Sequence, residues 1–241
     1  MSVVVLTGTG TGVGKTVVAA AVAALALDVR QRVAVLKPAQ TGVGPDDPGD
    51  LAEIERLAGP ITARELARFP DPLAPATAAR RAGTAPVHPS QAAAAAVELN
   101  RTHDLVIVEG AGGLLVRFDD DGGTVADVAW ALGVPVLIVA EAGLGTLNAT
   151  ALTAEALQRR GITCAGVVIG AWPAEPDLAA RCNLEDLPVA ANAQLLGALP
   201  AGASALSRPE FLATARRSLA PSLGGEFDAK GFAAQQLSAA G

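Results

Sequence analysis

Short apolar runs alternate along the chain with longer segments of helical character. The apolar runs contain few polar residues, which is typical of strands buried on both faces of a parallel sheet. They occupy residues 3–6, 32–36, 104–108, 134–140 and 164–169, with another short one at 195–200. Helices are expected at 17–25, 51–59, 91–99, 149–159 and around 178–187. This alternation, with its short connections, predicts an α/β fold with a doubly wound, mostly parallel sheet in three α/β/α layers.

Two segments do not follow the alternation. Residues 60–89 are rich in proline, alanine and arginine, and we expect them to form a loop that lines a site or an interface. Residues 224–241 carry too little apolar mass to stand alone, and they are expected either to be disordered or to pack as one helix. Residues 1–223 are then predicted to form a single domain.

Composition and charge narrow the functional class. The 241 residues are 51% hydrophobic and only 17% charged, which is enough for one sizeable core. A formal net charge of −6 leaves no basic stripe for a nucleic-acid partner. Cys164, Cys182, His88 and His103 lack the spacings of metal sites, and both histidines are interpreted as surface residues. Without an export signal or an apolar run of about 18 residues, we expect a cytoplasmic protein that does not span a membrane.

The strongest chemical signal is a glycine-rich stretch between the first strand and the first helix, Gly8-Thr9-Gly10-Thr11-Gly12-Val13-Gly14-Lys15-Thr16. Alternate glycines let several backbone N–H groups converge on one anion, which the N-terminus of the next helix also faces. Lys15 adds positive charge for the β- and γ-phosphates, and the Thr16 hydroxyl suits Mg²⁺. Thr9 stands where the P-loop formula has glycine, and a turn that binds nothing is the alternative. We expect a P-loop NTPase-like fold, with a nucleoside triphosphate bound by Gly12, Val13, Gly14, Lys15, Thr16 and Val17.

Two residues after the second strand are candidates for the same crevice. Lys37 follows the strand at 32–36 directly, and ligands of doubly wound sheets bind outside the carboxyl ends of the strands. A surface lysine that ends a strand is the alternative. Asp50 precedes the helix at 51–59, where it either caps that helix or binds a metal ion.

A further landmark follows the strand at 104–108, where Glu109 is succeeded by small residues. A carboxylate at the end of a buried strand is where P-loop proteins hold Mg²⁺ or its water. Small residues allow a ligand to approach the backbone closely, and a buried carboxylate needs a cation nearby. The nucleotide is therefore also expected to contact Asp50, Glu109, Gly110, Ala111 and Gly112. The predicted Mg²⁺ ligands are Thr16, Asp50 and Glu109.

Four motifs in this order resemble those of dethiobiotin synthetases, and the likeness runs from residue 2 to about residue 200. The motifs are Gly8-Thr9-x-Thr11-x-Val13-Gly14-Lys15-Thr16, Lys37-Pro38 with Thr41, Val108-Glu109-Gly110-Ala111-Gly112-Gly113, and Leu144-Gly145-x-x-Asn148. The resemblance implies a homodimeric enzyme that uses ATP and Mg²⁺ to carboxylate 7,8-diaminopelargonate with CO₂ or bicarbonate. A carbamate and a carbamic-phosphoric anhydride would be intermediates, and dethiobiotin, ADP and phosphate the products.

The resemblance also implies roles for individual residues. Lys15 and Lys37 would hold the γ-phosphate and the carbamate, and Thr11 and Thr41 would position the diamine and the carbamate. The catalytic set is thus Lys37, Lys15 and Thr11. The neighbouring subunit would bind the diamine's carboxylate through the loop that starts the helix at 149–159, whose N–H groups suit an anion. This loop comprises Gly143, Leu144, Gly145, Thr146, Leu147 and Asn148.

Two departures from the family pattern concern the nucleotide. Gly12 stands where some relatives have glutamate, and Gly170 stands where many have an asparagine suited to the adenine edge. Only backbone groups then remain to meet the base, and we expect triphosphate binding to survive while preference for adenine is relaxed. The residues predicted at the base are Gly170, Ala171, Pro200, Ala201 and Gly202.

Two other classes of P-loop protein are alternatives. An amide-forming enzyme of the cobyrinate amide synthase type would need a glutaminase half with a nucleophilic cysteine, and neither Cys164 nor Cys182 has that context. A partitioning-type switch ATPase usually carries a second lysine in the phosphate loop, where this chain has Gly10.

Overall fold

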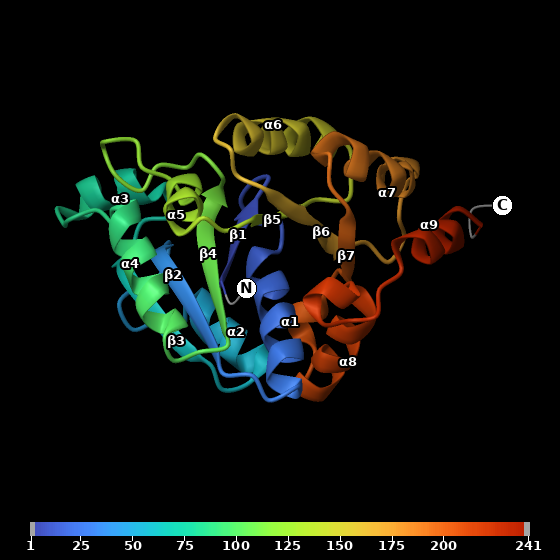
Figure 1. The fold of residues 1–241 in the computed structure, drawn as a ribbon, viewed down its shortest axis with the longest axis horizontal. Helices are drawn as coiled ribbons and strands as arrows, with labels where there is room; N and C mark the ends of the chain where they lie inside the picture. The colour runs from blue at the N-terminus through green and yellow to red at the C-terminus, as the bar shows by residue number, and fades with distance from the viewer. Residues whose placement is uncertain (1–2, 239–241) are drawn as a thin grey trace.

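The computed structural model describes residues 3–238, which form one seven-stranded sheet covered by helices on both faces (Figure 1). Every strand pair in this range is parallel, in the order β3-β2-β4-β1-β5-β6-β7. The strands are β1 (Val3–Gly8), β2 (Val33–Thr41), β3 (Thr62–Phe69), β4 (Leu105–Gly113), β5 (Val136–Ala140), β6 (Cys164–Trp172) and β7 (Leu195–Pro200). The predicted α/β/α architecture is confirmed.

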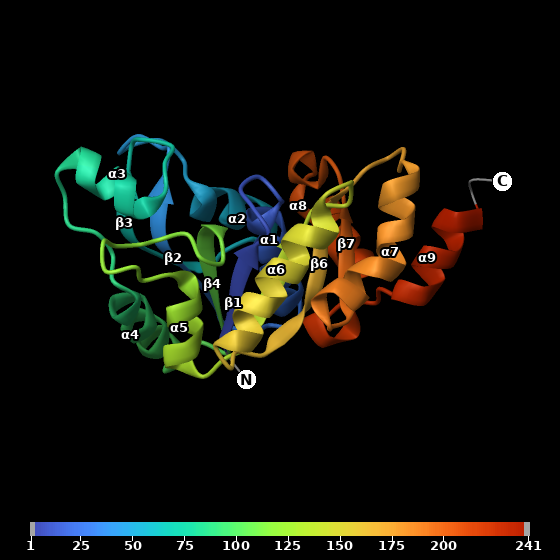
Figure 2. The same ribbon diagram turned by 90° about the horizontal axis from the view of Figure 1, so that it is seen from above.

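The helices divide between the two faces of the sheet. Figure 1 shows α6 and α7 on the opposite side from α1 and α8, and Figure 2 gives the view from above. The helices are α1 (Lys15–Asp28), α2 (Asp50–Ala58), α3 (Pro75–Ala82), α4 (Pro89–Asn100), α5 (Val125–Leu132), α6 (Thr146–Arg159), α7 (Leu178–Ala191), α8 (Arg208–Ser218) and α9 (Ala229–Ser238). Apolar side chains of α1, α2 and α8 form one core cluster with the sheet, and those of α4, α5 and α7 form another.

The central strand β1 lies between β4 and β5, at the point where the connections change direction across the sheet. The chain leaves β1 toward β2 on one side and later crosses from β4 to β5 on the other. Loops after the strands on either side of such a switch point separate and leave a crevice at the carboxyl ends. The glycine-rich loop, which follows β1, therefore starts at that crevice.

The prediction of a loop over residues 60–89 was wrong in two places. Residues Thr62–Phe69 form β3, and residues Pro75–Ala82 form α3. β3 pairs only with β2 at the edge of the sheet and is mostly half-buried. A strand in that position needs no continuous apolar run, which is why the pattern did not reveal it. The intervening residues 70–74 do form a loop, and α5 and α8 are further helices that the pattern did not predict.

The C-terminal segment packs as a helix where the structure describes it. Phe227 is buried, and the ring of Phe232 in α9 meets Trp172 at the end of β6 edge-on, with ring centroids 5.3 Å apart. Residues 239–241 of the predicted tail lie outside the described residues. Within residues 3–238, no helix has the length and apolar character needed to cross a bilayer.

Candidate active site

The glycine-rich loop joins β1 to α1 and turns tightly at two glycines. Gly12 and Gly14 have φ angles of 79° and 93°, which are left-handed conformations that favour glycine. A Cβ atom at Gly8 would lie 2.6 Å from the Gly10 carbonyl oxygen, so a side chain there would force the loop open. Lys15, the first residue of α1, donates from Nζ to that same oxygen at 2.9 Å. The loop thus carries a lysine folded back over its own backbone.

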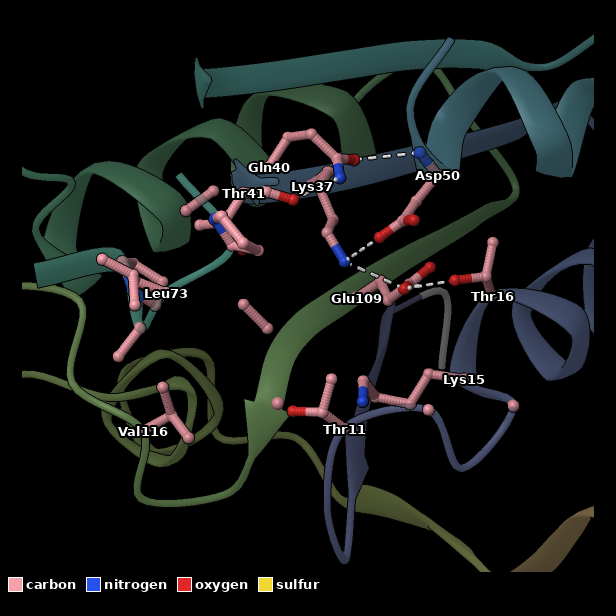
Figure 3. Close-up of a pocket in the computed structure, with 18 of the residues that line it drawn as sticks. Thr11, Lys15, Thr16, Lys37, Gln40, Thr41, Asp50, Leu73, Glu109 and Val116 are labelled. Atoms are coloured by element: carbon pink, nitrogen blue, oxygen red, sulfur yellow. Dashed lines mark hydrogen bonds and ion pairs between the residues drawn. The ribbon is translucent and has the colours of Figure 1, made fainter. Parts of the chain in front are cut away.

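Lys37 is buried among acidic side chains rather than exposed at the end of a strand. Its Nζ lies 2.9 Å from Glu109 Oε1 and 2.5 Å from Asp50 Oδ2, and the residue is 3% exposed (Figure 3). The last register pair between the neighbouring strands β2 and β4 is Leu36 with Val108, and Lys37 and Glu109 follow it directly in the two strands. The alternative of a surface lysine is wrong.

Glu109 links the three chain segments of this cluster. Its Oε1 accepts hydrogen bonds from Thr16 Oγ1 and Lys37 Nζ, both at 2.9 Å, and the residue is 1% exposed. Its Oε2 is buried and has no hydrogen-bond partner within the described residues. A buried carboxylate oxygen without a partner is costly in a protein interior, so this atom is suited to a bound cation.

Asp50 starts α2 but does not cap it. The N-cap residue is Gly49, and the Asp50 carboxylate instead pairs with Lys37. Of the two roles left open by the sequence, helix capping is therefore wrong. Asp50, Thr16 and Glu109 line the same cavity and supply the hard oxygen atoms that Mg²⁺ prefers as ligands.

The two lysines experience opposite electrostatic environments. Burial lowers the pKa of Lys15, and the positive charge of Lys37 lowers it further, while Glu109 and Asp50 oppose this. Burial also acts to lower the pKa of Lys37, but the charges and hydrogen bonds of Glu109 and Asp50 outweigh it and raise that pKa. Lys37 is thus held as a cation, and its charge is balanced by the Glu109 and Asp50 carboxylates.

These groups line a cavity of about 680 Å³ at the switch point of the sheet. Its polar wall comes from the glycine-rich loop, β2, α2 and β4, as Figure 3 shows. Its opposite wall is largely apolar and comes from the loop after β3 and the segment after β4. The cavity brings together these predicted residues: Thr11, Gly12, Gly14, Lys15, Thr16, Val17, Lys37, Thr41, Asp50, Glu109, Ala111 and Gly112.

Comparison with known proteins places this site in a family. A family model described as "AAA domain" matches residues 2–207. The ATP-dependent dethiobiotin synthetase BioD of Saccharopolyspora erythraea is 67% identical over 227 residues, which cover 94% of this chain and 99% of the relative. That of Streptomyces coelicolor is 63% identical over 232 residues, with 96% and 98% covered. The chain belongs to the dethiobiotin synthetase family.

Solved structures with the same architecture are more distant. The cell division ATPase MinD of Pyrococcus furiosus is 18% identical and superposes over the full length of both chains with a TM-score of 0.56. The ParA family ATPase of Chlorobium tepidum is 13% identical, with 89% of this chain and 96% of that chain covered and a TM-score of 0.55. At these identities the likeness shows the P-loop ATPase fold alone. Neither alternative class of P-loop protein is favoured over the dethiobiotin synthetase family.

Some residues that the family resemblance points to lie outside the main cavity. Gly170 is buried against the glycine-rich loop, and a Cβ atom there would lie 2.0 Å from the Val13 carbonyl oxygen. Ala171, the next residue in β6, is exposed. The Trp172 carbonyl accepts a hydrogen bond from Ala201 N at 2.7 Å, which joins the predicted base-binding segments to each other. Those segments, with Pro200 and Gly202, do not line the cavity between the glycine-rich loop and β2.

The loop at residues 143–148 also lies outside this cavity in the single chain. Gly145, with φ of 96°, is the N-cap residue of α6, and Thr146 starts the helix. Asn183 in α7 holds the loop from behind, because its buried Nδ2 donates to the carbonyls of Ala142 and Gly143. Leu144 is 90% exposed at the tip, so the loop presents an apolar side chain outward, while the Thr146 N–H donates to the Gly143 carbonyl at 3.3 Å.

Several cavity residues were not among those predicted individually from the sequence. They are Gln40 and Ala39 in β2, Pro72, Leu73, Ala74 and Pro75 after β3, and Val116 after β4. The expectation that the proline-rich segment lines a site is met by residues 72–75. Pro75 starts α3, and Gln40 lies inside β2. Neither residue belongs to a sequence motif that would have indicated its place in the cavity.

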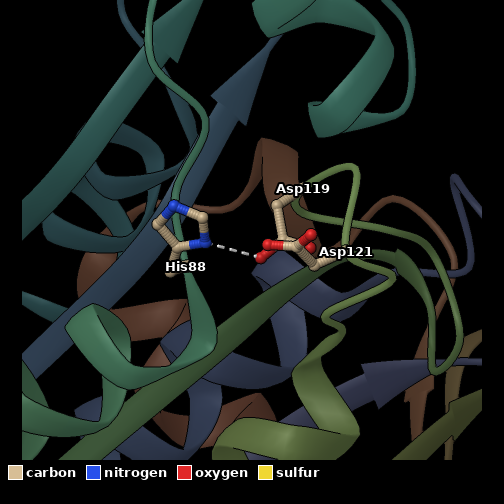
Figure 4. Close-up of side chains that lie close together, drawn as sticks. All are labelled: His88, Asp119 and Asp121. Carbon is tan, nitrogen blue, oxygen red and sulfur yellow. Dashed lines mark hydrogen bonds and ion pairs between the residues drawn. The ribbon is translucent and has the colours of Figure 1, made fainter.

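The interpretation of His88 as an ordinary surface residue was incomplete. His88 Nδ1 lies 2.8 Å from the buried Asp119 Oδ2, and Asp121 lies close to both (Figure 4). Burial acts to raise the pKa of Asp119, but hydrogen bonds from Gly123 N–H and His88 outweigh it and lower that pKa. This pairing ties the start of α4 to the loop before α5 and lies apart from the candidate active site. His103 likewise meets Thr62 Oγ1 from Nε2 at 2.8 Å.

Proposed function

We propose that the protein catalyses the ATP-dependent closure of a cyclic urea from 7,8-diaminopelargonate and CO₂, which yields dethiobiotin, ADP and phosphate. The observation that carries the proposal is the buried Lys37 held between Glu109 and Asp50, beside the P-loop Lys15, in a chain of the dethiobiotin synthetase family. The unpaired state of Cys164 and Cys182 is consistent with a reducing cytoplasm as its location.

The triphosphate would be bound at the start of α1. Backbone N–H groups of the glycine-rich loop and the positive end of the α1 dipole face an anion there. Lys15 would exchange its contact with the Gly10 carbonyl for the terminal phosphates. Thr16, Asp50 and Glu109 would hold Mg²⁺, which when bound neutralises negative charge on the phosphate oxygens. The unpartnered Oε2 of Glu109 and the hard oxygen donors fit that ion.

The substrate would occupy the other half of the cavity. One amine attacks CO₂ and loses a proton, which forms a carbamate; Lys37 would hold its charge, and Thr11 and Thr41 would orient it. A carbamate oxygen then attacks the γ-phosphorus and ADP leaves. The second amine attacks the carbonyl carbon, and phosphate leaves as the ring closes. The alkyl chain fits the apolar wall formed by Pro72, Leu73 and Val116. Alignment and fixed charge supply the rate of such a phosphoryl transfer.

The proposal is tested by whether phosphate release from ATP depends on the diamine and bicarbonate. We expect phosphate release only when ATP, Mg²⁺, bicarbonate and the diamine are all present, together with a product of the mass of dethiobiotin. Phosphate release that is equally fast without the diamine would contradict the proposal and would favour a switch ATPase.

Nucleotide selectivity is expected to be weak. The phosphate contacts are charge-assisted, whereas Gly170 offers no side chain to the base and has no room for one beside Val13. Calorimetric titration with ATP, GTP and CTP should give dissociation constants within about a hundredfold of one another. A preference for ATP beyond that ratio, equal to about 2.7 kcal/mol, would contradict the prediction.

We infer that a second copy of the chain completes the substrate site, because the loop at residues 143–148 faces outward. The N–H groups at the start of α6 suit the diamine's carboxylate, and Leu144 and Leu152 are exposed apolar side chains on that helix and its loop. Light scattering should show a dimer, and Leu144→Asp should raise both the dimer dissociation constant and the KM for the diamine. A monomeric wild-type protein at catalytic concentration would contradict this inference.

A further inference from the structure

Helix α2 begins without a capping side chain of its own. Its N-cap residue is Gly49, and the first backbone N–H group, that of Asp50, donates instead to Gln40 Oε1 at 2.9 Å (Figure 3). Gln40 lies on β2 and is 4% exposed. Its Nε2 donates to the Thr41 carbonyl at 3.3 Å, which directs Oε1 toward the helix. The strand that carries Lys37 thus also supplies the acceptor that starts α2.

This hydrogen bond holds the backbone of Asp50 at the end of a connecting loop. The loop between β2 and α2, residues 42–49, contains three glycines and two prolines, and at its start the Gly42 N–H donates to the carbonyls of Phe69 and Asp71. Arg68 on β3 braces its middle, since Nη1 donates to the carbonyls of Gly44 at 3.0 Å and Asp47 at 2.6 Å. Glu65 fixes the Arg68 guanidinium in turn. At the end of the loop, Gln40 holds the residue that pairs with Lys37.

Gly49 shows how tightly this end of the loop is packed. A Cβ atom there would lie 2.8 Å from Gln40 Oε1 and 3.0 Å from Arg68 Nη2. The φ angle of Gly49 is −100°, which any residue adopts, so glycine is required for the close approach and not for the backbone conformation. An alanine at this position would displace the side-chain oxygen Oε1 of Gln40 from the Asp50 N–H, although Gln40 and Asp50 themselves would be unchanged.

We propose that Gln40 is a positioning residue, which sets the Asp50 carboxylate for the divalent cation bound with the nucleotide. The inference rests on the proposed function, because Asp50 is a cation ligand only in that scheme. Gln40 touches no reacting atom. Its loss would let the start of α2 and the Asp50 carboxylate move away from Lys37 and Thr16. Since the net contribution of one buried hydrogen bond is modest, the effect on cation affinity should be moderate but specific.

The test measures cation binding directly. Gln40→Met removes the acceptor with little change in size, and Gly49→Ala displaces it. Both variants should raise the dissociation constant for Mn²⁺, measured by electron paramagnetic resonance with a non-hydrolysable ATP analogue bound, by about 3- to 10-fold. The matched control is Gln91→Met, because Gln91 Oε1 accepts from the His88 N–H at 2.9 Å at the start of α4, away from the site. The control should leave the Mn²⁺ dissociation constant unchanged.

Comparing Gln40→Met with Gln91→Met separates a loss of Asp50 positioning from a general loss of stability. If Gln40→Met and Gln91→Met lower the melting temperature alike and neither changes Mn²⁺ affinity, Gln40 acts only as a helix cap and the proposal is overturned. Gly49→Ala decides the question if Gln40→Met does not fold. The Mn²⁺ assay tests the role of Gln40, whereas product formation tests the proposed function. Failure of the wild-type protein to form dethiobiotin would therefore refute the proposed function without deciding the role of Gln40.

Discussion

Replacing Lys37 with alanine should lower the turnover of dethiobiotin formation by about 10²- to 10³-fold, while the dissociation constant for ATP changes by less than about threefold. Lys37 is a fixed cation between Glu109 and Asp50 at the cavity wall, where charge develops on the carbamate in the proposed reaction. Within residues 3–238 its hydrogen bonds and ion pairs go to Asp50, Glu109 and the Gly110 carbonyl and not to the glycine-rich loop, which carries the phosphate-binding groups. Steady-state kinetics and calorimetry on the same preparation measure the two quantities.

The variant also leaves two carboxylates without their cation. Removing one partner from a buried ion pair destabilises proteins by about 3–5 kcal/mol, so unfolding in denaturant should show a loss of that order without Mg²⁺. The control is Lys230→Ala, since Lys230 is the third lysine of the chain and lies exposed in α9. It should change neither turnover nor stability. A Lys37→Ala protein that is folded under the assay conditions and keeps wild-type turnover would end the proposed role.

Glu109→Gln should reduce turnover by about 10²-fold and raise the Mg²⁺ concentration for half-maximal activity by about tenfold or more. The amide keeps the shape of the side chain and can still accept one hydrogen bond from Thr16 or Lys37. It removes the negative charge and replaces the unpartnered Oε2 with a donor or a weaker acceptor. A cation bound there loses its most deeply buried anionic ligand, so its affinity should fall. Activity measured across a Mg²⁺ titration, with Mn²⁺ binding as a second readout, checks this result.

The control for this variant is Glu98→Gln, because Glu98 and its ion-pair partner Arg64 are both solvent-exposed. Surface ion pairs contribute little to stability, so its kinetics and Mg²⁺ dependence should match those of the wild type. If Glu109→Gln kept the wild-type Mg²⁺ dependence and lost only stability, Glu109 would be a structural partner of Lys37. The metal site would then have to be sought elsewhere.

The chemical groups of the polar wall could be predicted because each is tied to the end of a strand by a few residues. Strand β1, the glycine-rich loop and α1 follow one another directly, so Lys15 and Thr16 are placed by local structure. Lys37 and Glu109 lie in the middle of β2 and β4, but each directly follows the last register pair of these parallel neighbours, Leu36 with Val108, so the apolar runs before them bring the two side chains together. The family resemblance then assigned roles that geometry alone does not give.

The apolar wall and the supports of the site could not be predicted in the same way. β3 is a half-buried edge strand, and its neighbour α3 starts at a proline, so neither shows the apolar run of a central element. Gln40 and Asp50 are separated by a loop whose path depends on Arg68, a residue further along the chain. No spacing in the sequence encodes those contacts.

The amino-acid sequence by itself determined the alternation of strands and helices apart from β3, α3, α5 and α8, together with the phosphate-binding loop and the acidic and basic residues that follow the apolar runs, because burial and backbone conformation act over short stretches of chain. Only the tertiary structure decided that Lys37 is buried between two carboxylates, that Asp50 is held by Gln40, and that Gly170 is packed against Val13. These are contacts between segments that are distant in the chain, and their energies depend on packing distances that no local pattern specifies.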